Sequence, residues 1–435
     1  MIFKSKNYEV GDKILVKTFS DETKGTLLES YEPGIILVKL ESGYNIGIDR
    51  SNIVEIKILE KAIKKEVEEK EFKLSHKKPV IDLIMTGGTI SSSLDVKTGG
   101  VKWLTSPGEL FKFYPEIFEL ADIRVINPFM KFSEDMLSED WQKIAKLVVK
   151  SLNDSSVKGV ILTHGTDTLH YTGAALSFMI KDLNKPVVLT YSQRSSDRGS
   201  SDAELNLYCA AKVALSDIAE VTLVGHANMD DEYCFALQAN KCRKMHSSRR
   251  DTFKPINTTP LAKVYRDKIE VLREYNKRKT GKEAKAVLEN CFESRVALVK
   301  FYPGQDPEIL EHYFKEGYKG VIIEMTGLGQ VLTEGSRNWI PIIKRLVEKN
   351  FIICAASQTI YGTLDPLVYS SGRELSEAGV IYLKDMLAET SFVKLGWVLG
   401  KFEEEKKKFT KEDVEKLMLE NISGEFNERL GDLFC

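Results

Sequence analysis

Apolar and polar residues alternate with a short period over the first 60 residues. Short apolar runs are separated there by glycine, aspartate and serine, which is typical of β-strands joined by tight turns. Gly47 falls inside the fourth run, where a glycine can mark a bulge or a barrel corner. We expect residues 1–60 to form a small, SH3-like β-barrel that serves for docking. The expected strands are 13–19, 25–30, 35–40, 44–48 and 53–59.

The pattern changes at residue 61 and again after Pro79. Residues 61–79 are rich in lysine and glutamate of mixed sign, which favours a solvated connector over a nucleic-acid contact. Beyond Pro79, apolar runs of about four to seven residues alternate with helical patterns, which indicates βαβ units and a mostly parallel sheet. We therefore expect an α/β domain over residues 80–272. Its strand candidates are 80–85, 159–163, 186–190 and 221–225.

Helices and a second α/β unit are predicted from the rest of the pattern. Apolar side chains at 141, 144, 145, 148 and 152 keep the spacing of an amphipathic helix, and another helix is expected over 201–215. A hydrophilic stretch within residues 273–294 indicates a second linker, and residues 295–435 a smaller α/β unit. In that unit we expect strands at 296–301, 320–324 and 351–355, and helices near 307–316, 339–348 and 411–420.

Composition narrows the classes of function. The chain has 435 residues and 43% apolar residues, as in ordinary globular proteins, and 62 basic against 64 acidic residues leave a net charge of −2. A chain with so little net charge is not expected to bind nucleic acid tightly unaided. The sequence lacks a run of about 18 apolar residues and a signal-peptide pattern, so we expect a cytoplasmic chain without membrane contact. Six cysteines and six histidines show no paired spacing, so neither disulfides nor a metal site is expected.

Two turns that follow predicted strands carry unusual residues. Thr-Gly-Gly-Thr-Ile occupies 86–90 and Thr-His-Gly-Thr-Asp-Thr occupies 163–168. Ligands of open α/β sheets bind just beyond the carboxyl ends of strands, and paired glycines allow a tight turn that leaves Thr89 pointing at a ligand. The dinucleotide and phosphate-binding glycine motifs are missing, as is the serine nucleophile elbow.

A threonine hydroxyl attacks a carbonyl only when a neighbour accepts its proton. Asp167 and a basic cluster over residues 241–250 could provide that help, with a lysine oriented by the aspartate. For most side chains over residues 243–250 we expect a solvated loop. His164 and His246 have no evident partner in the sequence and are expected to be structural.

Four segments in order resemble the bacterial-type asparaginase/glutaminase family. They are the turns 86–90 and 164–168, the segment Phe-Ser-Glu-Asp-Met at 132–136 and the segment Lys-Met-His-Ser-Ser at 244–248. The resemblance continues weakly through Gly327 and residues 357–358. It implies an asparaginase-like α/β fold, in which a large domain with a mostly parallel sheet precedes a smaller carboxyl-terminal domain.

The resemblance also implies a role for each matching residue. Thr89 would be the nucleophile that attacks a side-chain amide, and Thr166, Asp167 and Lys244 would form the proton-transfer triad. The α-carboxylate and α-amino groups of the amino acid would be held by Ser133 and Glu134, together with Asp167. Backbone N–H groups near Gly88 and Gly165 would stabilise the oxyanion.

One segment departs from that family. Its members carry a tyrosine on the loop after the first threonine, whereas residues 91–103 contain none. Thr98 and Trp103 are the nearest polar and aromatic substitutes. The preferred amide, asparagine or glutamine, therefore stays open.

The amino-terminal residues resemble a narrower family, the D subunits of archaeal-type glutamyl-tRNA(Gln) amidotransferases. The extra barrel, the strand around 43–48 and Gln-Arg-Ser-Ser-Asp-Arg at 193–198 carry this resemblance. It implies an amidase without a cofactor of its own, which releases ammonia from L-glutamine or L-asparagine. A separate E subunit would bind the tRNA, use ATP and Mg²⁺, and convert Glu-tRNA(Gln) to Gln-tRNA(Gln), in an assembly of two copies of each chain.

Three alternatives remain open at the level of the sequence. The nearest is a stand-alone cytosolic L-asparaginase, which would work without a partner. A two-domain protein that binds small amino acids without chemistry would tolerate the loss of Thr166. In the third, residues 1–79 would be an RNA-binding module.

Overall fold

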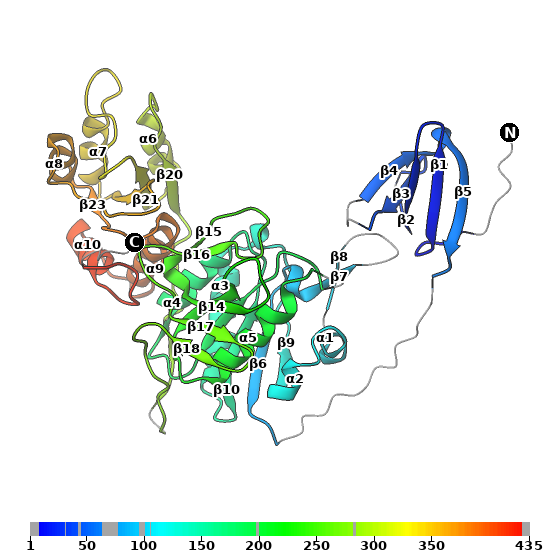
Figure 1. Cartoon of the computed structure of the whole chain (residues 1–435). Helices are drawn as coiled ribbons and strands as arrows, with labels where there is room; N and C mark the ends of the chain where they lie inside the picture. The colour runs from blue at the N-terminus through cyan, green and yellow to red at the C-terminus, as the bar shows by residue number, and fades with distance from the viewer. Residues whose placement is uncertain are drawn as a thin grey trace.

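The computed structural model describes residues 8–30, 32–41, 45–62, 77–94, 101–104, 106–196, 200–281 and 284–428. Figure 1 shows an amino-terminal sheet, a large central α/β unit and a smaller carboxyl-terminal α/β unit. The loop residues 95–100, which include Thr98, lie outside the described residues, as do the middle of the charged connector and the last residues of the chain.

The first five strands form one antiparallel sheet in the order β4-β3-β2-β1-β5. β1 pairs with both β2 and β5, so the last strand returns beside the first, and β4 and β5 lie at the ends of the sheet. Alternate residues such as Ile14 and Val16 are fully buried in a small core of their own. The five predicted strands are confirmed as β1 (Lys13–Thr18), β2 (Glu22–Leu28), β3 (Ile35–Lys39), β4 (Asn45–Asp49) and β5 (Ile53–Glu60).

An eight-stranded sheet, in the order β18-β17-β14-β13-β12-β10-β6-β9, forms the centre of the large unit. The five strands from β13 to β9 are parallel, which confirms the expected mostly parallel sheet. Three further strands extend it in antiparallel orientation. The strands are β6 (Val80–Met85), β9 (Asp122–Ile126), β10 (Val157–Thr163), β12 (Val187–Thr190), β13 (Val221–His226), β14 (Tyr233–Gln238), β17 (Ala262–Tyr265) and β18 (Ile269–Val271).

Helices cover both faces of this sheet. The predicted amphipathic helix is α3 (Ser138–Leu152), whose apolar stripe is buried in the same cluster as α4 (Leu169–Met179). The helix predicted over 201–215 is α5 (Ala203–Leu215), which belongs to a second cluster on the other face together with α1 (Pro107–Phe113). Shorter elements of this unit are α2 (Ile117–Leu120), β7 (Ser92–Leu94), β8 (Val101–Trp103), β11 (Ile180–Lys181), β15 (Cys242–Lys244), β16 (Phe253–Pro255) and β19 (Val287–Leu288).

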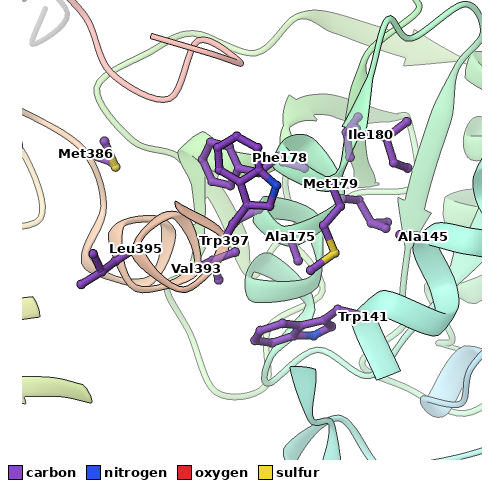
Figure 2. Close-up of a cluster of buried hydrophobic side chains, with 14 of the residues drawn as sticks. Trp141, Ala145, Ala175, Phe178, Met179, Ile180, Met386, Val393, Leu395 and Trp397 are labelled. Carbon is purple, nitrogen blue, oxygen red and sulfur yellow. The ribbon is translucent and has the colours of Figure 1, made fainter. Parts of the chain in front are cut away.

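The carboxyl-terminal unit contains a parallel four-stranded sheet, β20-β21-β22-β23. Its helix α9 (Ala388–Glu404) packs against α4 of the large unit, and the Trp397 and Phe178 rings stack at 6.0 Å (Figure 2). The hydrophobic core therefore runs without a break between the two units. The other elements are β20 (Val296–Lys300), β21 (Gly320–Met325), β22 (Ile352–Ser357), β23 (Ile381–Tyr382), α6 (Glu308–Lys315), α7 (Ile340–Val347), α8 (Ser370–Glu377) and α10 (Lys411–Leu419).

The basic stretch that follows β18 lies along the large unit. The backbone N–H of Arg278 donates to the carbonyl of Asp217 at 2.7 Å, and that of Lys279 to Asn184 at 3.1 Å. The Arg278 guanidinium also donates to the carbonyl of Ser216 at 2.5 Å. This part of the expected linker 273–294 thus contributes hydrogen bonds to the large unit.

Candidate active site

The carboxyl ends of β6 and β10 place the two sequence turns against each other. β6 and β10 are neighbouring parallel strands, and the Thr86 hydroxyl donates to the carbonyl of Thr163 at 2.8 Å. Beyond them, Ser91 donates its hydroxyl to the Thr163 hydroxyl at 2.7 Å. Both hydrogen bonds are buried, so they fix the position of the first turn relative to the second.

The first turn depends on the missing side chain of Gly88. This glycine has φ +82°, and a Cβ there would lie 2.4 Å from the carbonyl oxygen of His164 and 2.5 Å from the backbone N of Gly165. Thr89 follows immediately and starts a short 3₁₀ helix that ends at Ser91. Its side chain is half-buried, and within the part of the chain that the structure describes its hydroxyl has no hydrogen-bond partner. The hydroxyl is therefore available to a ligand.

The second turn is joined to a lysine that lies 77 residues further along the chain. Lys244 Nζ donates to Thr166 Oγ1 at 2.8 Å and to Asp167 Oδ1 at 2.7 Å. The lysine and Thr166 are largely buried, whereas the Asp167 side chain is 62% exposed. The three residues proposed as a triad are thus brought together, with one side open to solvent.

The segment expected to bind substrate lies beside the same turn. Gly87 and Lys131 form a parallel bridge that leads the chain into a 3₁₀ helix, Ser133–Asp135. The Ser133 hydroxyl accepts the backbone N–H of Asp167 at 3.2 Å, and a Cβ on Gly165 would lie 2.8 Å from that hydroxyl oxygen. Ser133 is buried and the Glu134 side chain is exposed.

Sequence reasoning gave no role to Thr168, which also holds this segment. Its hydroxyl donates to the carbonyl of Ser133 at 2.6 Å. The only signal in the sequence was its place at the end of the second turn. Thr168 therefore uses its hydroxyl to fix the backbone of the segment that is expected to bind substrate.

His164 is a fully buried structural residue, as expected. Burial, with a smaller contribution from the neighbouring His170, lowers its pKa to about 4, although the hydrogen bond with the Gly165 carbonyl opposes the shift. Since a carbonyl only accepts, Nδ1 at 2.7 Å from Gly165 O carries the proton, and Nε2 accepts from the Thr172 hydroxyl at 2.9 Å. The imidazole is neutral at physiological pH and supports the turn.

The basic segment over residues 243–250 is only in part the solvated loop that we expected: His246 and Arg249 are exposed, whereas other cations of the cluster are not. Lys241 is buried and bound to Asp385 at 2.9 Å, and Arg243 pairs with Glu389 at 2.8 Å. Arg250 is also largely buried. The burial of these cations was not apparent from the sequence because their carboxylate partners lie outside the segment.

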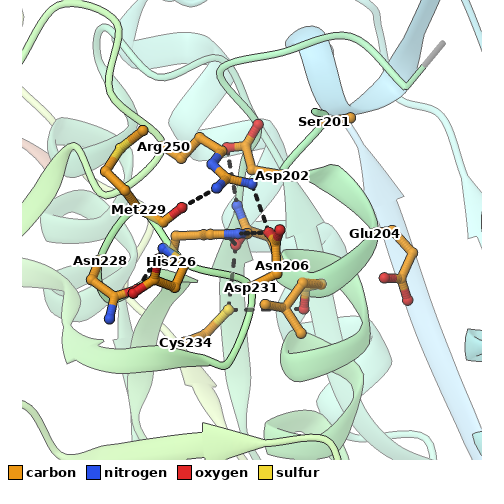
Figure 3. Close-up of polar contacts among 12 residues, drawn as sticks. Ser201, Asp202, Glu204, Asn206, His226, Asn228, Met229, Asp231, Cys234 and Arg250 are labelled. Carbon is orange, nitrogen blue, oxygen red and sulfur yellow. Dashed lines mark hydrogen bonds and ion pairs between the residues drawn. The ribbon is translucent and has the colours of Figure 1, made fainter. Parts of the chain in front are cut away.

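Arg250 begins a polar network that reaches α5 (Figure 3). It binds Asp231 at 2.6 Å, and Asp231 contacts His226 Nε2 at 3.0 Å. His226 Nδ1 in turn lies 2.6 Å from Asn206. Next to Asn206, the buried carboxylate of Asp202 accepts two backbone N–H groups of the loop after β12, and burial raises its pKa. The loop after Lys244 and the loop after β12 are thus parts of one framework.

Metal-binding clusters and membrane-spanning helices are both absent from the described residues. These residues contain no group of three or more His, Cys, Asp or Glu side chains arranged to hold a metal ion. None of the described helices is long and apolar enough to cross a membrane.

Three parts of the chain match known protein families. Residues 8–59 match the GatD N-terminal domain, residues 80–277 the N-terminal asparaginase domain, and residues 295–411 the glutaminase/asparaginase C-terminal domain. The four segments that carry Thr89, Ser133, Thr166 and Lys244 all lie within the second match.

Relatives match over nearly the full length. The chain is 48% identical to the D subunit of the glutamyl-tRNA(Gln) amidotransferase of Thermococcus kodakarensis, over 96% of this chain and 94% of the relative. The corresponding protein of Pyrococcus furiosus is 45% identical, over 97% and 96%. Among solved structures, the thermostable L-asparaginase from Thermococcus kodakarensis superposes with a TM-score of 0.71 at 29% identity, over 80% of this chain and all of that one.

Proposed function

Because the chain belongs to the family of glutamyl-tRNA(Gln) amidotransferase D subunits, we propose that it hydrolyses the side-chain amide of a free amino acid to supply ammonia to a partner subunit. The observation that carries this proposal is the contact of Lys244 Nζ with both Thr166 and Asp167, beside the turn that presents Thr89. These groups match the requirements of a threonine nucleophile with a proton acceptor close by.

The proposed reaction uses these groups in turn. Thr89 Oγ1 attacks the amide carbon, and its proton passes to the group formed by Thr166, Asp167 and Lys244. Backbone N–H groups near Gly88 and Gly165 stabilise the oxyanion. The same group returns the proton to the leaving nitrogen, which departs as ammonia. Water then hydrolyses the threonine ester, which restores Thr89 and releases the acidic amino acid.

The amino acid itself is held by the adjoining segment. Ser133 and Glu134 bind its α-carboxylate and α-amino groups, together with Asp167. The exposed carboxylates of Glu134 and Asp167 offer the negative charge that an ammonium group requires. L-glutamine and L-asparagine are the two substrates proposed.

The partner performs the chemistry that this chain lacks. An E subunit binds the tRNA, activates the glutamyl group with ATP and Mg²⁺, and receives the ammonia, in a cytoplasmic assembly with two copies of each chain. This chain uses no cofactor. Its net charge of −2 is compatible with a division of labour in which tRNA is held mainly by the partner.

A stand-alone L-asparaginase explains the chain less well. The structural match to the Thermococcus kodakarensis asparaginase covers 80% of this chain, whereas the D subunits match over nearly all of it, including the amino-terminal sheet. An amino-terminal sheet that docks a partner would serve a complex but would not be needed for amide hydrolysis alone.

The test is ammonia release from glutamine and from asparagine, with and without the E subunit and glutamyl-tRNA(Gln). We expect amide hydrolysis to rise when both are added and Gln-tRNA(Gln) to form in step with it. Full hydrolysis by the chain alone, unchanged by the partner and the tRNA, would favour the stand-alone asparaginase.

A further inference from the structure

The strand that carries Lys244 is fastened at its beginning by the carboxyl-terminal unit. Lys241, three residues before Lys244, binds Asp385 Oδ2 through Nζ at 2.9 Å. The two side chains are only 3% and 1% exposed. A buried ion pair of this kind keeps its geometry, because moving one charge away would leave the other buried without a counter-charge, which is strongly destabilising.

Asp385 is held by more than this lysine. Its Oδ1 accepts the backbone N–H of Asn427 at 2.7 Å, and its Oδ2 also accepts the Asn427 side-chain amide at 2.8 Å. The next residue, Met386, is buried in the core shared by both units (Figure 2). The carboxylate therefore accepts two hydrogen bonds from Asn427 in addition to its contact with Lys241.

Two more contacts join residues 240 and 243 to the start of α9. The Thr390 hydroxyl donates to the carbonyl of Asn240 at 2.8 Å, and Arg243 Nε donates to Glu389 at 2.8 Å. Beyond Lys244 the support is thinner, because residues 245–249 are exposed and the hairpin is closed by Met245 N–H donating to Thr252 O at 2.7 Å. Lys244 also pairs directly with the buried Phe253 of β16, so its position is set by that pairing together with the contacts at residues 240–243.

We propose that Asp385 is a positioning residue for the amide hydrolysis: by holding Lys241, it sets the 2.8 Å contact between Lys244 Nζ and Thr166 Oγ1. The inference rests on the proposed function, because it gives the carboxyl-terminal unit a part in the same reaction. A shift of about 1 Å in the lysine is enough to lower the rate about 100-fold in reactions that depend on near-attack geometry.

The first experiment compares Asp385→Asn with Glu425→Gln in the full-length chain with its partner. Glu425 forms another buried pair, with Lys394 at 2.5 Å and both side chains fully buried, and among the described residues it contacts no member of β15. Both variants should lower the melting temperature. Well below melting, Asp385→Asn should lower kcat about tenfold or more with KM within about twofold, whereas Glu425→Gln should keep kcat. Equal losses of kcat in the two variants would overturn the positioning role.

A double variant separates position from stability. Asp385→Asn alone leaves Lys241 buried without its counter-charge, and Lys241→Met combined with Asp385→Asn removes that charge. We expect the double variant to regain melting temperature while kcat stays low, since a methionine cannot bind residue 385. Recovery of kcat together with stability would contradict the proposal.

A third readout does not depend on activity. Labelling of the Lys244 amine by acetic anhydride, read by peptide mass spectrometry, reports how firmly the amine is held. Labelling should be faster in Asp385→Asn than in the wild-type chain and unchanged in Glu425→Gln; equal labelling in all three would refute the positioning role. Faster labelling in a chain that hydrolyses neither amide would leave the positioning intact and reject the proposed function.

Discussion

Gly88→Ala is expected to separate the two turns of the site. Gly88 has φ +82°, and an added Cβ would lie 2.4 Å from the carbonyl oxygen of His164 and 2.5 Å from the N of Gly165. Ordinary contacts begin at 3.4 Å, so the turns would have to move apart by about 1 Å. Both clashing atoms belong to backbone, which cannot rotate away as a side chain can.

The loss of stability expected for Gly88→Ala has two parts. Gly88 has φ +82° and ψ 161°, a region essentially restricted to glycine, where an alanine costs about 1–3 kcal/mol, and the forced separation adds about 1–3 kcal/mol through overpacking. For the rate, a misplacement of about 1 Å between Thr89 and the Thr166 turn should lower kcat about 100-fold.

Gly304→Ala is the matched control. Gly304 also has φ +82°, but the nearest atom to an added Cβ there is Arg337 Nη1 at 3.7 Å, an ordinary contact. Both variants place an alanine at a positive φ, and only Gly88→Ala has the clash with backbone atoms. The assay is ammonia release under saturating amide, together with thermal melting. If Gly88→Ala kept the kcat of Gly304→Ala, close contact of the two turns would not be needed for the reaction.

Three further changes test other parts of the site. Lys244→Met should lower kcat about 1,000-fold in the ammonia assay, since acid–base help contributes about 100- to 10,000-fold, and should leave the circular dichroism spectrum unchanged; a fall of less than tenfold would contradict the role of the lysine. Ser133→Ala should raise KM about tenfold with little change in kcat, because it removes a hydrogen bond to a charged substrate group, and an unchanged KM would count against it. For His164, whose folded pKa is about 4 against about 6.5 when unfolded, the unfolded chain takes up the proton first as pH falls. The free energy of unfolding should therefore drop by about 3 kcal/mol as the pH falls from 6.5 to 4, as measured in urea titrations. His164→Gln should reduce this pH dependence, and an equal dependence in the variant would refute the assignment.

The strands and the order of the motifs could be predicted because their signals are local. The run before Thr86 is apolar except for Asp82, and two glycines follow Thr86, which predicts both the strand and the turn. The parallel order of β6 and β10 then brings Thr89 and Thr166 to one edge of the sheet, as the general rule for α/β sheets predicts.

Helices buried on all sides escaped the sequence patterns. α4 has ten buried residues in an eleven-residue helix because it lies between the sheet and α9, so it shows no alternation of apolar and polar faces. α9 is buried over most of its length for the same reason. The three antiparallel strands beyond β13 were missed as well; the last of them, β18, has three residues and is mostly exposed, so it has a weak pattern.

Contacts between distant residues could not be predicted from one sequence. Lys241 and Asp385 are 144 residues apart, and neither lies in a motif. A lysine in a basic cluster is usually solvated, so its burial became apparent only when the fold supplied a carboxylate.

The central claim is that Thr89 carries the acyl group during amide hydrolysis. The most direct measurement is acid quenching of the enzyme during turnover, followed by peptide mass spectrometry to locate the acyl ester. We expect the ester on the peptide that contains Thr89, and neither ester nor ammonia with Thr89→Val. An ester on Thr166 instead, or wild-type ammonia release by Thr89→Val, would contradict the claim.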